Sequence, residues 1–529
     1  MKISRFFSTA MLAATTLTSA SLHSARAAGA GETSAEISSL KRQLHLLEQR
    51  LDKLQQGSAA GATKSKVAAN SQATAALTTS NGKSAAKAPP LAAGALVSMP
   101  SNRPTICTDD GENCVGITGR VHWDVGGYDY RPNTAATSPQ RLNSGENVRR
   151  ARIGLAGKFF GDWNFALVYD FGGSSDGFGG AAAGSLPGGG LSGLENAYLS
   201  YTGLKPFGGK MAIEGGIMDI PWTIDEATSS NDITFMERSS AQVIAVNVAA
   251  GDFRSTFGTR WWNDSFWAGG YVTGPTTGSI HSASSVTPAG ATEQFGAVAR
   301  VAGQLISGNN YSLHLGANAE WLVQPSRNLV TNTQTVSFSD RPELRIDPTA
   351  LISTGAIANA SGAQVYGAEA AANYGSLYFQ GEYYWYNVDR SASTGLPPIG
   401  APSLHFQGGY AQASFVLTGE ARTYNASTGS YNGIKPADPF SMRSGGWGAW
   451  EVAGRVSTID LNDGLATAAG VAGGRQTVYT AALNWYINGN LRLMLDYLHG
   501  DVARQQSPTS TADRGAMFDA VAMRTQLAF

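Results

Sequence analysis

The stretch DWNFALVYDF at residues 162–171 alternates between two kinds of side chain. Every second residue is large and apolar, namely Trp163, Phe165, Leu167, Tyr169 and Phe171. The residues between them are mixed and polar. Because successive side chains of a β-strand point to opposite faces, this pattern predicts a strand with one apolar, aromatic face. Residues 377–386 and 491–497 repeat the same division.

Two kinds of all-β protein contain such strands. A soluble sandwich hides the apolar face against a second sheet, whereas a membrane barrel turns it towards lipid. Strands of about ten residues, short turns such as residues 488–490, long Gly/Ser/Pro loops and only 15% charged residues favour the barrel. No apolar run reaches the roughly 20 residues that a spanning helix needs. We therefore predict an all-β fold, a transmembrane antiparallel β-barrel.

The pattern identifies the type of the strands more closely than their number. Alternation gives roughly seventeen candidates, and since bacterial barrels have an even number, at least one candidate is wrongly split or missed. The last ten residues, AVAMRTQLAF, place Val521, Met523, Thr525 and Leu527 on one face with the terminal Phe529. This ending is similar to the terminal strand that bacterial barrel-assembly machinery recognises, which predicts that machinery as a partner.

The first 27 residues predict export. Lys2 and Arg5 precede an apolar stretch from about residue 11 to residue 22, and Ala25-Arg26-Ala27 is a small-x-small cleavage signal. We interpret residues 1–27 as a signal peptide. Its removal leaves an acidic mature chain, and the absence of a basic surplus argues against nucleic acid as a partner.

Residues 28–56 predict a short coiled-coil helix. Apolar residues recur there at alternating spacings of three and four, at Ile37, Leu40, Leu44, Leu47, Leu51 and Leu54. This spacing fits a coiled coil between protomers, and it also fits an amphipathic helix that lies on its own barrel. Residues 57–105 are rich in Ala, Ser, Thr, Gly, Lys and Pro, a composition typical of a flexible linker.

Residues 106–114 hold the two cysteines of the chain, Cys107 and Cys114, in CTDDGENC. In an exported protein they can close a small disulfide loop. The acids Asp109, Asp110 and Glu112 suggest either a calcium site or a solvated turn, and the turn is favoured because calcium wants six or more oxygens. We expect no metal and no cofactor.

Several longer blocks resemble the phosphate-selective porin O and P family over residues 115–529. They are SSNDITFMERS at 229–239, RPE at 341–343 followed by Thr354-Gly355, QGEYY at 380–384, LTGE at 417–420, GAWEVAGRVSTIDLND at 448–463 and LNWYING at 483–489. The resemblance implies a barrel of about 16 strands, usually a homotrimer, that carries small anions passively across the outer membrane of a Gram-negative bacterium. Phosphate or polyphosphate is the implied solute.

Bulk charge does not predict an anion channel, since residues 115–529 hold 26 basic and 32 acidic residues. Selectivity depends on the charges that line the pore. Alternation places Arg150 and Arg152 on the inward face with Lys158, and places Arg149 on the outward face with Ile153. Similar alternation places further arginines inward, namely Arg254, Arg260, Arg300, Arg455, Arg492 and Arg524. These arginines either guide anions or pair with inward acids such as Glu382, Glu451 and Asp496.

The resemblance implies roles for two further segments. Arg149 and Arg150 stand where the family has an arginine pair that contributes to a ladder for anions. Residues 219–238 resemble the family's constriction loop, which here carries Asp225, Glu226, Asp232, Glu237 and Arg238 but none of the family's lysines. The acids either admit cations and neutral solutes or bond the loop to the barrel wall.

The sequence gives little support for catalysis. Residues 173–177 match G-x-S-x-G but lie in a glycine-rich loop, not in a strand-turn-helix elbow, and the seven histidines lack the spacing of a zinc site. We predict an outer-membrane porin for small anions. A weakly selective pore for small hydrophilic solutes is the alternative within transport. A tether from outer membrane to peptidoglycan, with the N-terminal segment in the periplasm, is the alternative from another class.

Overall fold

The computed structural model describes residues 96–100, 103–134, 141–172, 193–251, 253–276, 290–391 and 403–529. The signal peptide, the coiled-coil helix, most of the linker and the G-x-S-x-G stretch therefore lie outside the described residues. Within the described residues no helix is long and apolar enough to cross a membrane.

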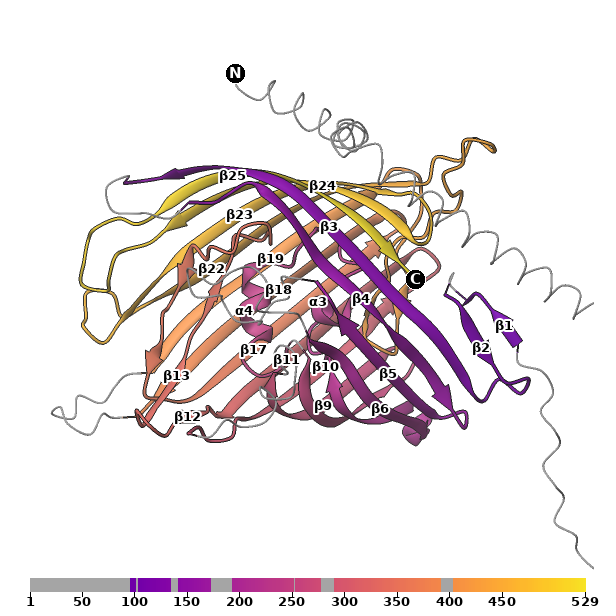
Figure 1. The fold of residues 1–529 in the computed structure, drawn as a ribbon, viewed down its shortest axis with the longest axis horizontal. Helices are drawn as coiled ribbons and strands as arrows, with labels where there is room; N and C mark the ends of the chain where they lie inside the picture. Colours follow the sequence, from indigo (N-terminus) through magenta and orange to yellow (C-terminus); the bar gives the residue numbers. More distant parts are fainter. Residues whose placement is uncertain are drawn as a thin grey trace, which may run out of the picture. The chain divides into compact units, whose positions relative to one another are not determined.

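Sixteen antiparallel strands form a closed barrel, because the last strand pairs with the first barrel strand over Ala516–Ala528 and Arg120–Pro132. Figure 1 shows this closure between β25 and β3. The strands are β3 (Cys114–Pro132), β4 (Gly145–Phe159), β5 (Trp163–Asp170), β6 (Leu194–Leu204), β7 (Lys210–Met218), β8 (Arg254–Trp262), β9 (Phe266–Thr276), β10 (Phe295–Ser307), β11 (Tyr311–Gln324), β17 (Ala360–Tyr374), β18 (Leu377–Arg390), β19 (Leu404–Val416), β22 (Ala449–Asp463), β23 (Val471–Tyr486), β24 (Leu491–Ala503) and β25 (Ala516–Ala528). The predicted barrel is confirmed, and the count of roughly seventeen strands is one too many.

The period-two alternation determines which side chains face outward. In β18, Phe379 and Trp385 are about half exposed, whereas their neighbours Tyr378 and Tyr386 are buried inside the barrel. Trp163, Leu167 and Phe171 are likewise exposed on the outer face. An apolar outer wall around a polar interior is the arrangement that a lipid bilayer requires.

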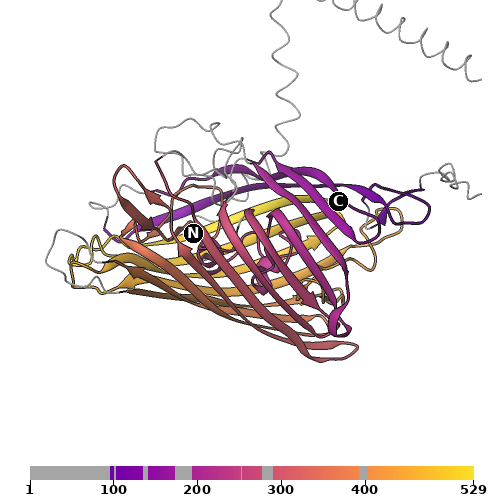
Figure 2. The same ribbon diagram turned by 90° about the horizontal axis from the view of Figure 1, so that it is seen from below.

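The two ends of the barrel differ. Turns of two to five residues join neighbouring strands at one end, such as residues 160–162, 205–209 and 375–376, and we call this the short-turn end. At the opposite, long-loop end, residues 219–253 follow β7 and residues 325–359 follow β11. Residues 417–448, between β19 and β22, are the one long connection at the short-turn end within the described part of the chain. Figure 2 shows the oblique course of the strands between the two ends.

Segments from both ends fold into the barrel. The connection after β7 contains α3 (Ile224–Ala227) and α4 (Ser240–Val246), which Figure 1 shows within the ring of strands. Thr223 and Ser239 begin these helices by accepting hydrogen bonds from the backbone N–H groups of Glu226 and Gln242. Every residue of α4 is buried, and the helix packs against β18, β19 and β22. The lumen therefore contains a packed interior beside any passage.

Short strands complete the connections. They are β12 (Arg327–Asn328), β13 (Thr333–Val336), β14 (Ser339–Asp340), β15 (Ile352–Ser353) and β16 (Ile357–Ala358) after β11, and β20 (Tyr424–Asn425) and β21 (Ser430–Tyr431) after β19. A 3-10 turn, η3 (Pro206–Gly208), joins β6 to β7.

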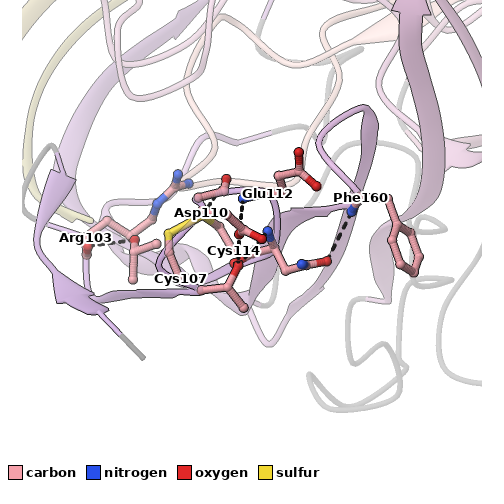
Figure 3. The surroundings of a disulfide bond; sticks show 10 residues. Arg103, Cys107, Asp110, Glu112, Cys114 and Phe160 are labelled. Atoms are coloured by element: carbon pink, nitrogen blue, oxygen red, sulfur yellow. Dashed lines mark hydrogen bonds between the residues drawn. A yellow bond between two sulfur atoms is a disulfide. The ribbon is translucent and has the colours of Figure 1, made fainter. Parts of the chain in front are cut away.

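A small extension precedes the barrel at the short-turn end. β1 (Leu96–Ser98) pairs with β2 (Thr105–Cys107), and β2 pairs with the start of β3. Cys107 and Cys114 form a disulfide that closes the turn between them (Figure 3). Within this turn the Thr108 hydroxyl donates a hydrogen bond to Asp110, which lowers the pKa of that carboxyl below its ordinary value. The Asp110 carboxylate thus bonds within the turn.

Candidate lumen anion site

A β-bulge in β4 determines the orientation of the arginine pair. His122 of β3 lies opposite Arg150, but the next residue, Trp123, lies opposite Val148, so Arg149 is the extra residue of the bulge. Both arginines are buried inside the barrel, at 1% and 3% exposure. The prediction that Arg149 faces outward is therefore wrong, because an inserted residue breaks the two-residue period from which it was made.

Glu237 of the inward loop is bonded to arginines from two strands. The Arg149 guanidinium donates to both of its carboxylate oxygens, at 2.9 and 3.2 Å. Arg524 of β25 donates to the same carboxylate at 2.6 Å and to Asp124 at 2.6 and 2.7 Å. Arg150 lies further away, with its Nη1 at 3.8 Å from Glu237. The loop acid thus neutralises Arg149 and Arg524 and ties the loop to the wall.

Four other predicted arginines also hold inward segments in place. Arg455 donates to Glu343 at 2.7 Å and to the Glu237 carbonyl at 2.8 Å, and Arg492 donates to the Ile233 carbonyl at 2.7 Å. Arg300 donates to Glu369 at 2.7 Å and to carbonyls of residues 221, 428 and 429. Arg254 donates to carbonyls of residues 247, 251 and 274. These side chains serve as anchors for the loops.

Other charged residues of the inward connection bond mainly to one another. Arg238 pairs with Asp225 at 3.3 Å and with Glu226 at 3.4 Å, and Glu226 accepts a hydrogen bond from Gln242 at 2.7 Å. Arg422 donates to the carbonyl of Asp232 at 2.9 Å. The carboxylate contacts with Arg238 and Gln242 lie within the connection itself, whereas Asp225 also accepts a hydrogen bond from Gln380 of β18 at 3.3 Å, so Asp225, like Glu237, is a loop acid that contacts the wall.

A cavity of about 320 Å³ lies between the inward loop and the wall formed by β3, β4, β6, β7 and β8. Its charged lining consists of Arg120, Arg149, Arg150, Arg152, Arg238 and Arg260 together with Glu214, Asp219 and Glu226. Ser229, Ser230, Asn196 and Tyr198 add hydrogen-bonding groups. Three further acids, Glu237, Asp170 and Glu195, pair with lining arginines from just outside this lining. Attraction for an anion therefore depends on which arginines these acids reach least closely.

In the described part of the chain, two of these arginines have no carboxylate nearer than 3.8 Å. Arg120 donates to the hydroxyls of Ser230 and Ser229, the latter at 3.4 Å. Arg150 has the 3.8 Å approach to Glu237 and a 3.4 Å contact with His122 Nδ1. In contrast, Arg152 pairs with Asp170 at 2.9 Å and with Glu195 at 2.7 Å, and Arg260 pairs with Glu214 at 3.1 Å.

Lys158 lies apart from the cavity. It pairs across the sheet with Cys114 and with Asn164 at the short-turn end, and it does not line the arginine-rich space. Lys158 as an anion contact therefore stays a prediction, and it lies apart from the arginine-rich cavity because residues that share one face of a strand can lie at opposite ends of a channel.

Sequence reasoning missed several residues of this network, among them Arg120, Arg422 and Glu343. Arg120 lies directly opposite Arg152 in the β3–β4 pairing, and the alternation of β3, with Ile117 and Val121 exposed, could have placed it inward. Arg422, which donates to Glu451 at 2.9 Å, and Glu343 lie on connections without a strand period. Within the described residues, no group of three or more His, Cys, Asp or Glu side chains could hold a metal ion.

The sixteen-stranded closed barrel, its apolar outer wall and its arginine-lined interior define an outer-membrane porin. The family model for phosphate-selective porin O and P matches residues 115–529, and the chain belongs to this family. The predicted resemblance is confirmed.

Two relatives and two solved structures show the range of similarity. Porin O of Pseudomonas aeruginosa is 23% identical over 426 residues, which are 74% of this chain and 84% of that protein. An uncharacterized protein of Caulobacter vibrioides is 32% identical over 217 residues, and the match spans 41% of this chain and 39% of that relative. OmpT of Vibrio cholerae in its trimer form (TM-score 0.42, 12% identity) covers 78% of this chain and 99% of its own. The anion-selective porin from Comamonas acidovorans (TM-score 0.40, 14% identity) covers the same shares.

Proposed function

We propose that the chain is a channel, not an enzyme, and that it passes small anions through the arginine-lined cavity. The observation that carries this proposal is the state of two arginines that line the cavity. In the described part of the chain, Arg120 bonds to serine hydroxyls, and Arg150 lies 3.8 Å from Glu237, a carboxylate that is closer to Arg149 and Arg524. Guanidinium groups stay charged at any relevant pH and can hold an oxyanion by two hydrogen bonds. A permeating anion would therefore complete contacts that the protein leaves open.

Phosphate or a short polyphosphate is the solute class we propose, as family membership implies. The hydroxyls of Ser229 and Ser230, next to Arg120, can rotate to donate to phosphate oxygens. A weakly selective pore is less favoured, because the loop acids that suggested it bond to arginines or to Gln242.

Conductance across planar bilayers tests the proposal. With the mature protein in a potassium chloride gradient, we expect a reversal potential of the sign that marks anion preference. Added phosphate should reduce the chloride current, since both ions would share Arg120 and Arg150. Cation preference, or a chloride current that phosphate leaves unchanged, would contradict the anion proposal.

The assembly and orientation are further proposals. We propose a homotrimer, as family membership implies, with the short-turn end towards the periplasm and barrel-assembly machinery recognising β25. The predicted coiled coil at 28–56 would then lie in the periplasm, strengthen the trimer and approach peptidoglycan. Deleting residues 28–95 tests this: we expect unchanged single-channel conductance, a trimer that dissociates more readily on heating, and weaker retention by purified peptidoglycan. A deletion without effect on either of the last two readouts would contradict the proposal.

A further inference from the structure

Lysine has an uneven distribution in the barrel. Residues 115–529 contain four lysines, Lys158, Lys205, Lys210 and Lys435. All four lie at the short-turn end: Lys158 near the end of β4, Lys205 and Lys210 on either side of the β6–β7 turn, and Lys435 in the connection from β19 to β22. The 22 arginines of the same range also occupy the lumen and the long-loop end. The four lysines of residues 115–529 therefore all lie at one rim of the barrel.

Two phenylalanines project from turns at the same rim. Phe207 between β6 and β7 is 95% exposed, and Phe160 between β4 and β5 is 78% exposed. Both have a left-handed backbone, with φ of 54° and 50°, and each is followed by a left-handed glycine. Asn, Asp or Gly is the usual residue at such a position, and a bulky side chain there is strained. An exposed aromatic ring in a strained turn points to a binding role.

The surrounding structure holds the β6–β7 turn in this shape. Trp261 of β8 donates a hydrogen bond from its indole Nε1 to the carbonyl of Pro206 at 2.9 Å. A Cβ at Gly209 would lie 2.6 Å from the Trp261 ring, so the ring packs directly on the turn. Phe207 thus projects from a turn that Trp261 holds in place. The side chains of Lys205 and Lys210, on either side of it, are also exposed.

The charge of this turn is positive. Residues 204–211, Leu-Lys-Pro-Phe-Gly-Gly-Lys-Met, contain two lysines and no acid, and the acids of the neighbouring turns are Asp162 and Asp264. Aromatic rings favour the headgroup level of a bilayer, and lysines near its surface attract anionic headgroups. We infer that the β6–β7 turn, with Phe207 between Lys205 and Lys210, is a docking site for anionic phospholipid in the leaflet at the short-turn end.

Quenching of tryptophan fluorescence by brominated lipid tests this inference, because Trp261 packs on the turn. The full mature protein is placed in phosphatidylcholine vesicles that contain a minority of either brominated phosphatidylglycerol or brominated phosphatidylcholine. We expect stronger quenching by the brominated phosphatidylglycerol. In the double variant Lys205→Gln/Lys210→Gln this preference should fall by roughly tenfold or to none. Arg327→Gln, an exposed cation near the long-loop end, should leave it unchanged.

Phe207→Asn separates lipid binding from folding. Asparagine fits a left-handed backbone better than phenylalanine, so this variant should unfold at an equal or higher temperature while its phosphatidylglycerol preference falls. Equal quenching by both lipids in the natural protein, or a preference that neither variant lowers, overturns the inference. Variants that change the oligomeric state and leave the lipid preference intact would instead assign this rim to contact between copies of the chain, which also overturns it.

Discussion

Glu237 lies 2.6 Å from Arg524, although the two residues come from opposite parts of the chain. The carboxylate belongs to the inward loop after β7, and the guanidinium belongs to the last strand. The same carboxylate holds Arg149 from the bulge of β4. One buried acid therefore joins the loop to two wall strands, on the two sides of β3.

Removing this charge should change both stability and selectivity. Glu237→Gln removes the negative charge beside the buried guanidinium groups of Arg149 and Arg524. Loss of one partner of a buried ion pair lowers the free energy of unfolding by about 3 to 5 kcal/mol. The freed positive charge should also raise the preference for anions. Denaturant unfolding and reversal potentials measure the two effects. Glu293→Gln, at an exposed position, is the matched control and should change neither; an unchanged stability of Glu237→Gln would contradict the anchoring role.

Arg150 should contribute more to selectivity than Arg149. Both face the lumen, but Glu237 neutralises Arg149 through two hydrogen bonds, whereas Arg150 has only longer contacts. A unit charge about 4 Å from an ion in water-like surroundings is worth about 1 kcal/mol, or roughly a fivefold change in preference. We expect Arg150→Ala to lower the anion-to-cation permeability ratio by about that factor. Arg149→Ala should lower it less and reduce the unfolding free energy more.

Arg120 provides an independent check on the same site. It lies on β3, outside the bulge, and bonds to Ser229 and Ser230. Arg120→Gln should weaken the block of chloride current by phosphate. Arg455→Gln removes a loop anchor outside the cavity and should mainly lower the free energy of unfolding. Titration of the chloride current with phosphate gives the comparison. Equal phosphate affinity in Arg120→Gln and the natural protein would place the anion contacts elsewhere.

Much of the wall could be predicted from the sequence because a strand has a simple period. Alternation identified the outward aromatic face of β18 and the inward direction of Arg152, Arg300 and Arg524. It failed at Arg149 because a bulge adds one residue without a mark in the hydrophobic pattern.

The lumen could be predicted less well, since its loops have no period. The contact between Glu237 and Arg524 joins residues 287 positions apart, and only the closed barrel brings them together. Arg422 belongs to a connection from the short-turn end, where short turns are the rule. The sequence supplied the family resemblance and the acids of the loop, but whether those acids face solute or wall depends on tertiary contacts such as that of Asp225 with Gln380 of β18.

Reduction of the disulfide should leave the barrel intact. Cys107 and Cys114 are seven positions apart and join only β2 to the start of β3. Closing so short a loop stabilises by about 2 to 3 kcal/mol, and because the loop lies in the extension before the barrel wall, this stabilisation acts on the extension. The double variant Cys107→Ser/Cys114→Ser should therefore keep the unfolding temperature and the conductance of the natural protein, while protease cleaves residues 96–113 faster. A large loss of barrel stability would show that the extension supports the wall.

The closure of the barrel depends on a glycine opposite the last residue. Gly119 of β3 exchanges two backbone hydrogen bonds with Phe529, at 3.0 and 2.9 Å, and the Phe529 ring lies across it. A Cβ at Gly119 would be 2.5 Å from that ring, so Gly119→Ala must displace the terminal side chain. Because the clashing atoms are the far end of a partly exposed ring that can turn away, we expect a loss of about 1 kcal/mol, the lower end of the usual cost of overpacking, and a lower folded fraction by heat-modified gel mobility. Gly454→Ala in β22 is the matched control, because its Cβ would meet no atom closer than 3.9 Å. Equal behaviour of the two variants would mean that the terminal ring does not secure the seam between β25 and β3.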